Sequence, residues 1–226
     1  MEIQRDKEGG EISPWIKDGL LFVVSAPSGA GKTTLCKEIV NYIPDIQHSI
    51  SYTTRSSRPS EVDGRDYHFV SVDTFKKMIA DETFIEWAIV HGNYYGTSKK
   101  DLTELLNNGI DLILDIDSQG AKQIKKTFKN GVFCYILPPS FADLRNRLMV
   151  RKGDSPDEIN KRLKMAGEEV KDYRIYEYLI INEDFDRALA ELKSIIVSAR
   201  IRMERINSAW VENNFIEKRG GEVSWK

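Results

Sequence analysis

A glycine-rich loop between a predicted strand and a predicted helix constrains this chain more than any other feature. The loop reads Ala26-Pro27-Ser28-Gly29-Ala30-Gly31-Lys32-Thr33-Thr34. The apolar run 20–24 predicts a buried strand, and the segment 32–43 predicts a helix that Pro44 ends. Such a loop aims successive backbone N–H groups and the positive end of the helix at one point, an arrangement that binds phosphate. The sequence therefore predicts a nucleoside triphosphate site.

Individual positions of this loop have distinct expected roles. Gly29 and Gly31 let the backbone approach the ligand, Lys32 reaches the β- and γ-phosphates, and the Thr33 hydroxyl is placed to bind Mg²⁺. Ala26 occupies the motif's first glycine position, where a methyl group fits if φ is negative. The alternative interpretation is a glycine-rich turn that binds nothing. A strand and a helix in register with the loop disfavour it.

Composition narrows the class of protein. The chain has 226 residues, 30% of them charged, and a formal net charge of −2, so no overall field favours nucleic acid or membrane surfaces. Residues 1–18 are polar and lack the apolar core of a signal peptide. Cys36 and Cys134 are expected as buried free thiols of a reduced compartment, with a disulfide or metal site as the alternative. We expect a cytoplasmic enzyme without a nucleic-acid or membrane partner.

The order of the remaining elements predicts the fold class. Apolar strand signals at 110–114, 132–137 and 178–181 alternate with helical segments at 120–129, 141–151 and 156–172. A final helix is expected from 185 to beyond 206. Strands that alternate with helices predict an α/β fold, a parallel sheet covered by helices on both faces. Ligands bind at the carboxyl ends of such strands, where the phosphate loop lies.

Two insertions and two terminal segments interrupt or extend this domain of residues 19–200. Short alternating segments, a helix near 73–80 and a turn at 92–96 predict a smaller α+β lobe at about 51–108. A helical lid is expected at about 145–173. The stretch 1–18 is an N-terminal extension, and 201–226 is a helical extension with a tail.

The inserted lobe carries candidates for a second phosphate site. Arg55 and Arg58 stand three apart in an irregular segment, and two guanidinium groups suit a phosphate monoester dianion. Tyr67 and Tyr95 can add phenolic donors. Two arginines alone are more often solvated loop charges, but the presence of a triphosphate loop in the same chain favours a binding role for them.

At this point the chain resembles the guanylate kinase family. The matching stretches are Ser25 to Lys32, Thr53-Thr54-Arg55, Arg58-Pro59, Glu61-Val62-Asp63-Gly64, Asp66-Tyr67, Phe84-Ile85-Glu86-Trp87, Gly92-Asn93-Tyr94-Tyr95-Gly96-Thr97 and Leu114-Asp115-Ile116-Asp117 with Gln119-Gly120. They occur in the family's order from about residue 19 to 200. The resemblance implies transfer of the γ-phosphoryl group of ATP to GMP with Mg²⁺, within a phosphate-loop sheet domain carrying a nucleoside-monophosphate lobe and a lid.

The resemblance also implies the roles of individual residues. ATP would lie on residues 26–34. Guanine would be held by Ser51, Glu86 and Thr97 with Asp117 nearby, and the GMP phosphate by Arg55, Arg58, Tyr67 and Tyr95. An ionised Glu86 can accept hydrogen bonds from both N1–H and the N2 amine of guanine, which adenine cannot offer. The alternative is a surface glutamate that points away from the lobe core.

Two carboxylates follow the strand at 110–114. Period-two alternation puts Asp115 and Asp117 on one side, facing the phosphate loop. We assign Asp115 to the Mg²⁺ shell, through water, and Asp117 to the GMP side. Either carboxylate could instead be a simple helix cap.

The lid is expected to bring cations to the transferring phosphate. Arg151 and Arg162 match the family's lid arginines best, although Lys152 stands where the family commonly has glycine. With Lys32, Arg55 and Asp115 they complete the predicted catalytic set. Asn182 resembles the residue near the family's adenine site and could equally cap the last helix.

Other functions stay open from the sequence alone. Some scaffold proteins carry guanylate-kinase-like domains that bind peptides and have damaged phosphate loops, whereas Lys32, Thr33 and Asp115 are present here. A kinase for adenylate, thymidylate or shikimate would share the sheet, but Glu86 and the segment at 53–58 argue against it. The last helix could pack on a second copy of the chain or on its own sheet.

Overall fold

A five-stranded parallel sheet forms the centre of the molecule. The computed structural model describes residues 18–90, 92–150 and 156–216. The sheet order is β2-β7-β1-β8-β9, with every pairing parallel, so β1 lies in the middle. The strands are β1 (Leu21–Ser25), β2 (Ile46–His48), β7 (Asp111–Asp115), β8 (Val132–Leu137) and β9 (Tyr178–Ile181). The predicted α/β class is confirmed, and the continuous apolar runs reflect burial on both faces.

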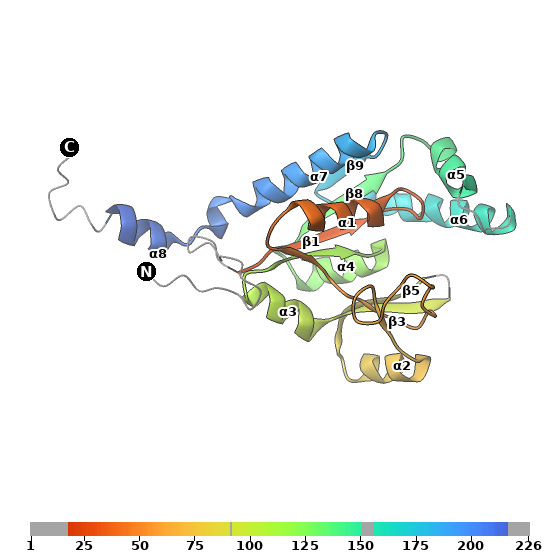
Figure 1. Cartoon of the computed structure of the whole chain (residues 1–226), viewed down its shortest axis with the longest axis horizontal. Coiled ribbons are helices and arrows are strands. Elements are labelled where there is room, and N and C mark those ends of the chain that lie inside the picture. The colour runs from red at the N-terminus through yellow and green to blue at the C-terminus, as the bar shows by residue number, and fades with distance from the viewer. Residues whose placement is uncertain (1–17, 91, 151–155, 217–226) are drawn as a thin grey trace.

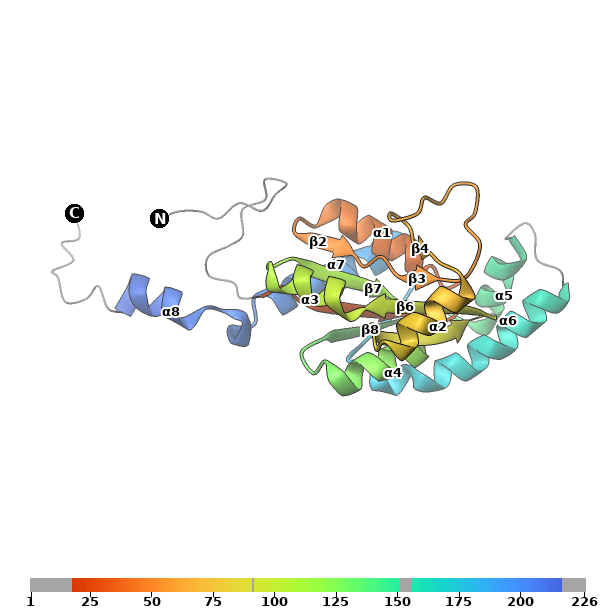
Figure 2. The same cartoon turned by 90° about the horizontal axis from the view of Figure 1, so that it is seen from below.

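Helices cover both faces of this sheet (Figures 1 and 2). On one face lie α1 (Lys32–Tyr42) and α7 (Phe185–Arg200), whose apolar side chains share a core with Phe22 and Ile113. On the other lie α3 (Lys99–Asn107) and α4 (Ser118–Thr127), packed on Leu21 and Leu114. The two cysteines, Cys36 and Cys134, are buried free thiols in the first core.

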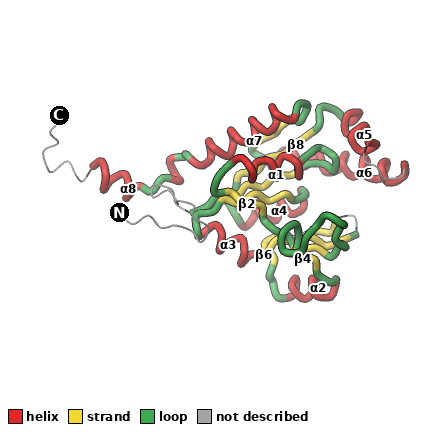
Figure 3. The backbone as a smooth tube through the Cα atoms, in the orientation of Figure 1, coloured by secondary structure: helices red, strands yellow, loops and turns green. Residues whose placement is uncertain are grey.

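A second sheet forms the inserted lobe, below the main sheet in Figure 3. Its order is β4-β3-β6-β5, in which β3–β4 is parallel and the other pairs are antiparallel. The elements are β3 (Tyr52–Thr53), β4 (His68–Phe69), α2 (Val72–Ala80), β5 (Phe84–Val90) and β6 (Asn93–Ser98). Phe75 of α2 stacks on Phe84 with ring centroids 4.5 Å apart, which closes the lobe's core.

Two details of the predicted lobe differ in the structure. The turn expected at 92–96 is shorter, because β6 begins at Asn93 and Tyr94 already pairs with Ile89 of β5. The predicted range 51–108 also takes in α3. That helix lies with the main sheet, because Leu102 and Leu106 bury themselves in its second core.

The lid consists of α5 (Phe141–Val150), α6 (Pro156–Glu169) and the 3₁₀ segment η1 (Val170–Ile175). Leu144 and Leu148 of α5 pack with Ala166 of α6 in a small core of their own. Figure 1 places α5 and α6 at one end of the molecule and α8 at the other. The lid thus stands beside the loop end of the main sheet.

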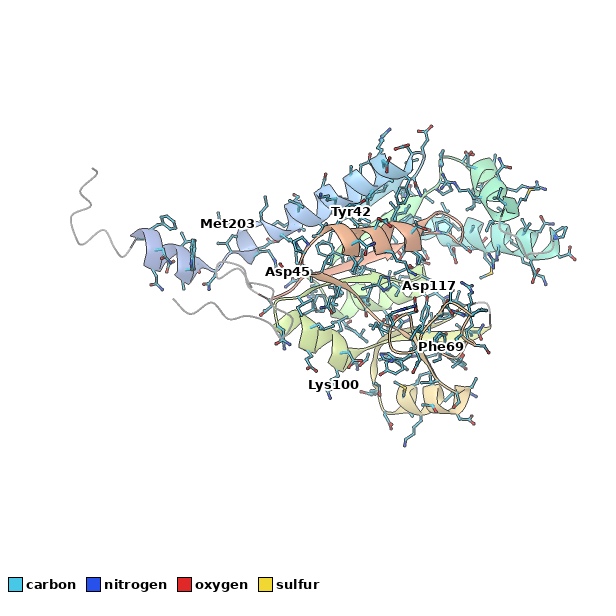
Figure 4. All side chains as sticks on the ribbon, in the orientation of Figure 1. Tyr42, Asp45, Phe69, Lys100, Asp117 and Met203 are labelled. Atoms are coloured by element: carbon cyan, nitrogen blue, oxygen red, sulfur yellow. The ribbon has the colours of Figure 1, made fainter. Side chains whose placement is uncertain are left out.

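The last long helix is shorter than the sequence predicts. The helix expected to pass Ile206 ends at Arg200, because Arg202 takes an extended backbone and Arg200 turns back to Asp111 Oδ2 (2.6 Å). Short segments follow: η2 (Met203–Arg205), α8 (Ser208–Val211) and a π-helical turn (Glu212–Ile216). Met203 is 85% exposed there (Figure 4). Among the described residues, no helix is long and apolar enough to span a bilayer.

Candidate active site

A cavity of about 490 Å³ opens where the main sheet, the lobe and the lid meet. It lies at the carboxyl ends of β1 and β7, as expected for a parallel sheet. Within the described ranges its lining comprises Ala26, Pro27, Ser28, Gly29, Ala30, Gly31, Lys32, Thr33, Thr34, Ser51, Tyr67, Glu86, Ala88, Val90, Tyr95, Asp115, Ile116, Asp117, Arg147 and Glu169. The whole predicted phosphate loop therefore faces one space with the predicted GMP-binding lobe.

The loop's backbone explains its glycines. Gly29 has φ 98° and Gly31 has φ 93°, values that L side chains rarely adopt. A Cβ at Gly31 would also lie 2.5 Å from Asn182 Nδ2. Ala26 is not among the described residues with positive φ, so its methyl group is tolerated as predicted.

Asn182 supports this loop from behind. It is buried, and its Nδ2 donates a 2.7 Å hydrogen bond to Ala30 O. The cap of α7 is Asp184, which accepts from Arg187 N, so the interpretation of Asn182 as the helix cap is wrong. Asn182 is absent from the cavity lining of the described residues, so its contact with ATP stays a prediction.

Arg147 is a cavity residue that the sequence did not single out as a ligand group. It lies on α5 and donates to Asn182 O (2.6 Å), which ties the lid helix to the support of the loop. Leu144 and Leu148 of α5 pack toward Gly29. Because Arg147 stands three residues after Leu144, it shares the helix face that meets the loop. That spacing was the one signal in the sequence that could have found it.

Lys32 and Asp115 form an ion pair at the floor of the cavity. Lys32 also donates to Ile116 O (2.9 Å). Burial opposes the charge on Lys32, but the Asp115 carboxylate outweighs it, so the pKa of Lys32 lies above its usual value. Burial likewise opposes ionisation of Asp115, and Lys32 with the Thr33 hydroxyl holds the pKa of Asp115 below its usual value. Both groups are therefore charged at neutral pH.

Asp117 is a helix cap that also lies at the cavity, and its contact with GMP stays a prediction. Strand β7 ends at Asp115, and Asp117 is the N-cap of α4, accepting from Gly120 N at 2.9 Å. It also lines the cavity, and Figure 4 shows it between the main sheet and the lobe. Capping fixes its position without removing it from the site.

The lobe contributes a buried carboxylate. Glu86 is only 3% exposed, and Thr97 Oγ1 donates a 2.6 Å hydrogen bond to its Oε1. Removal from water raises the pKa of Glu86 to about 7. Ser51 lies in the same lining. The interpretation of Glu86 as a surface glutamate is therefore wrong, and the carboxylate is available to hydrogen-bond donors of a ligand.

The predicted phosphate ligands of the lobe divide into two groups. Tyr67 and Tyr95 line the cavity. Arg55 instead holds Glu61 through two hydrogen bonds of 2.9 Å, with its guanidinium carbon 5.4 Å from the Tyr67 ring centroid. Arg58 is 67% exposed on its side chain. Neither arginine reaches the cavity lining in this conformation.

The lid places one acidic residue in the cavity. Glu169, at the end of α6, lines it, and burial together with the Asp117 carboxylate raises the pKa of Glu169. Arg162 is half-buried on α6 and is not part of the described lining. Arg151 and Lys152 lie outside the described residues. The lid arginines thus stay predictions.

Comparison with known proteins places this architecture. A sequence model described as guanylate kinase matches residues 19–199. Guanylate kinase of Geobacter metallireducens is 52% identical over 190 residues, which are 84% of this chain and 94% of the relative. That of Geobacter sulfurreducens is 51% identical over 193 residues, 85% and 95% of the two chains.

A solved structure agrees with these sequence relatives. The crystal structure of guanylate kinase from Anaplasma phagocytophilum superposes with a TM-score of 0.74 at 29% identity, covering 89% of this chain and 97% of that one. The fold is therefore shared over most of this chain. The chain belongs to the guanylate kinase family.

Proposed function

We propose that the cavity transfers the γ-phosphoryl group of ATP to GMP, giving ADP and GDP, the reaction that membership of the guanylate kinase family indicates. The observation that carries this proposal is the pairing, in one cavity, of a complete phosphate loop with the buried carboxylate of Glu86. The loop suits a triphosphate, and the carboxylate suits the adjacent N–H donors of guanine.

On the ATP side, residues 26–34 would hold the triphosphate. Their N–H groups and the start of α1 would bind phosphate oxygens, and the Lys32 ammonium would stabilise the negative charge that develops on the phosphate oxygens during transfer. The nucleophile is an oxygen of the GMP phosphate, which is already an anion. Positioning and electrostatics therefore supply most of the catalysis, and no strong general base is needed. Asn182 would act through the loop that it supports.

The donors present suit Mg²⁺. Mg²⁺ commonly keeps several waters and takes one or two protein oxygens with substrate phosphates. Thr33 and Asp115 offer a hydroxyl and an ionised carboxylate beside Lys32, which fits such a partial shell. Asp115 would act through water. The ion would neutralise charge on the transferring phosphate.

On the GMP side, Glu86, Thr97, Ser51 and Asp117 would surround the base. The GMP phosphate would meet Tyr67 and Tyr95. The guanidinium groups of Arg55 and Arg58 would complete that site once the lobe moves, exchanging the carboxylate of Glu61 for phosphate.

The lid would supply further cations. Arg151 and Arg162 would approach the transferring group as the lid closes, and Arg147 already lies in the cavity. The buried free thiols and modest net charge support a cytoplasmic role in supplying GDP from GMP. The apolar side of α7 packs on the chain's own sheet, so a homo-oligomer would have to form through another surface.

The direct test is a coupled assay that measures ADP formation from ATP with GMP, AMP, dTMP or UMP. We expect rapid turnover of ATP with GMP and not with the other three monophosphates. Lys32→Ala serves as the matched control for the chemistry and should lose roughly 10²-fold or more in kcat, the scale for losing one key electrostatic donor. Equal turnover with AMP, or none with GMP, would refute the proposal, and the latter would favour a non-catalytic interaction module.

A further inference from the structure

Among the contacts that helix α4 of the main domain makes with the lobe, one uses a side-chain amide. Strand β5 is the edge strand of the lobe sheet, so within the described part of the chain one side of its backbone has no strand partner. Gln123 of α4 fills that place at Trp87. Its Oε1 accepts from Trp87 N (3.2 Å), and its Nε2 donates to Trp87 O (2.7 Å). The amide thus pairs with the strand edge as a neighbouring strand would.

A β-bulge lies next to the pair of hydrogen bonds between Gln123 and Trp87, which we call the clamp. Phe84 pairs with Ser98 and Glu86 pairs with Thr97, which leaves Ile85 as the extra residue of β5. Ile85 packs against the second core of the main domain. A bulge re-aims the side chains that follow it, and here Glu86 comes next. Its orientation therefore depends on contacts with the main domain as well as with the lobe.

The first turn of α4 is shaped to receive Glu86. A Cβ at Gly120 would collide with Glu86 Oε2 and would lie 3.1 Å from its Cδ. Gly120 N is held by the capping carboxylate of Asp117. The carboxylate of Glu86 therefore rests against the start of α4, one turn before Gln123. Two points of the same helix, Gly120 and Gln123, bound the strand segment that carries Glu86.

We propose that Gln123 is a positioning residue for base recognition, whose amide holds Trp87 and so fixes Glu86 against Gly120. This inference rests on the proposed role of Glu86 in binding guanine. The cost of losing the clamp should appear in GMP binding, because ATP meets the other end of the cavity. Base choice is then set jointly by a main-domain helix and the lobe.

The test compares Gln123→Met with Lys126→Met. Methionine keeps the length of the glutamine stem and good helix propensity but loses both hydrogen bonds. Lys126 lies three residues later on the exposed side of α4, so the same replacement there controls for the helix. Glu86→Gln is measured in parallel. Steady-state assays give KM for GMP and for ATP, kcat, and the ratio of kcat/KM for GMP to that for AMP.

Gln123→Met should raise the KM for GMP roughly tenfold, leave the KM for ATP unchanged and lower the GMP-to-AMP ratio. Lys126→Met should match the parent. Unchanged constants in Gln123→Met, while Glu86→Gln loses base preference, would overturn this inference and leave the proposed function standing. If Gln123→Met raises the KM for GMP and the KM for ATP equally, or does not fold, Gln123 has a purely structural role. If neither Gln123→Met nor Glu86→Gln changes the preference for GMP over AMP, Glu86 itself does not read the base.

Discussion

Glu86 is a carboxylate that the lobe keeps away from water beside the Thr97 hydroxyl. Burial raises the pKa of Glu86 to about 7, against an ordinary value near 4.5. The folded protein therefore binds a proton here that the unfolded chain releases at lower pH. Stability from this group is present below about pH 4.5 and is lost as pH rises toward 7. Under the proposed function, this cost accompanies a buried carboxylate that would accept hydrogen bonds from guanine.

This titration predicts a pH dependence of GMP binding. Guanine N–H donors need the ionised carboxylate, so the parent's affinity for GMP should fall roughly tenfold per pH unit below 7. Glu86→Gln should lack that component. Calorimetric Kd values at pH 6 and pH 8 measure both proteins, and the titration of the GMP phosphate cancels in the comparison. Identical pH profiles would show that Glu86 does not bind the base in ionised form.

Arg58 predicts a substrate-specific effect. Its guanidinium is exposed and 3.9 Å from Glu61, so it is free to turn toward a phosphate. Arg58→Ala should raise the KM for GMP roughly tenfold to a hundredfold, the equivalent of losing charge-assisted hydrogen bonds of about 1.5–3 kcal/mol. The KM for ATP should stay nearly unchanged.

Arg65→Ala is the matched control for Arg58→Ala. Arg65 is equally exposed, lies in the same segment and pairs with its neighbour Asp66, so its loss should leave both KM values alone. If Arg58→Ala weakens both substrates alike, the arginine serves folding or closure of the lobe. If it weakens neither, Arg58 does not hold the GMP phosphate.

At the scale of elements, the phosphate loop depends on its neighbours in space. Gly31 has a positive φ and stands against Asn182, which in turn is held by Arg147 of the lid. Gly31→Ala should therefore weaken ATP binding strongly, with an increase in KM for ATP of at least roughly tenfold.

Gly64→Ala separates strain from collision. Gly64 also has a positive φ, 74°, but nothing lies within 4 Å of an added Cβ. Both variants should lose about 1 kcal/mol of stability to backbone strain, measured by thermal unfolding, while Gly31→Ala alone should lose ATP affinity. Normal ATP kinetics in a folded Gly31→Ala protein would contradict this account of the loop.

The elements also show what a sequence can predict. The strand–loop–helix unit at residues 21–42 was predictable because its apolar run, glycines and Pro44 are local signals. The end of α7 at Arg200 was not, because it depends on Asp111 and Pro44, far away in the chain. The place of Arg147 in the cavity likewise depends on a contact between α5 and Asn182, and the burial of Glu86 depends on a contact with Gly120 of α4. Helical spacing puts Arg147 on the same face as Leu144, but it does not say which loop that face meets.

At the scale of the whole molecule, three arginines that are predicted to bind phosphate lie away from the cavity. Arg55 and Arg58 lie outside the cavity lining, as does Arg162, although all are predicted to reach a phosphate. Transfer in an exposed cleft would let water accept the phosphoryl group. The lobe and the lid are therefore expected to move inward around the main sheet when both nucleotides bind.

Closure predicts a more compact particle. Small-angle X-ray scattering should give a smaller radius of gyration with GMP and a non-hydrolysable ATP analogue together than with neither. Each nucleotide alone serves as the control for ligand mass and for partial closure. Scattering curves that superimpose with and without both ligands would reject the movement and require another route for Arg55 and Arg58 to the phosphate.

The measurement that tests the central claim most directly is base discrimination by the parent and by Glu86→Gln. The parent should prefer GMP over AMP by roughly 10⁴-fold or more in kcat/KM, because adenine would leave a buried carboxylate facing a lone pair. Glutamine keeps the shape but replaces one acceptor with a donor, so GMP should bind worse and the preference should shrink. A Glu86→Gln protein that discriminates as sharply as the parent would contradict the account.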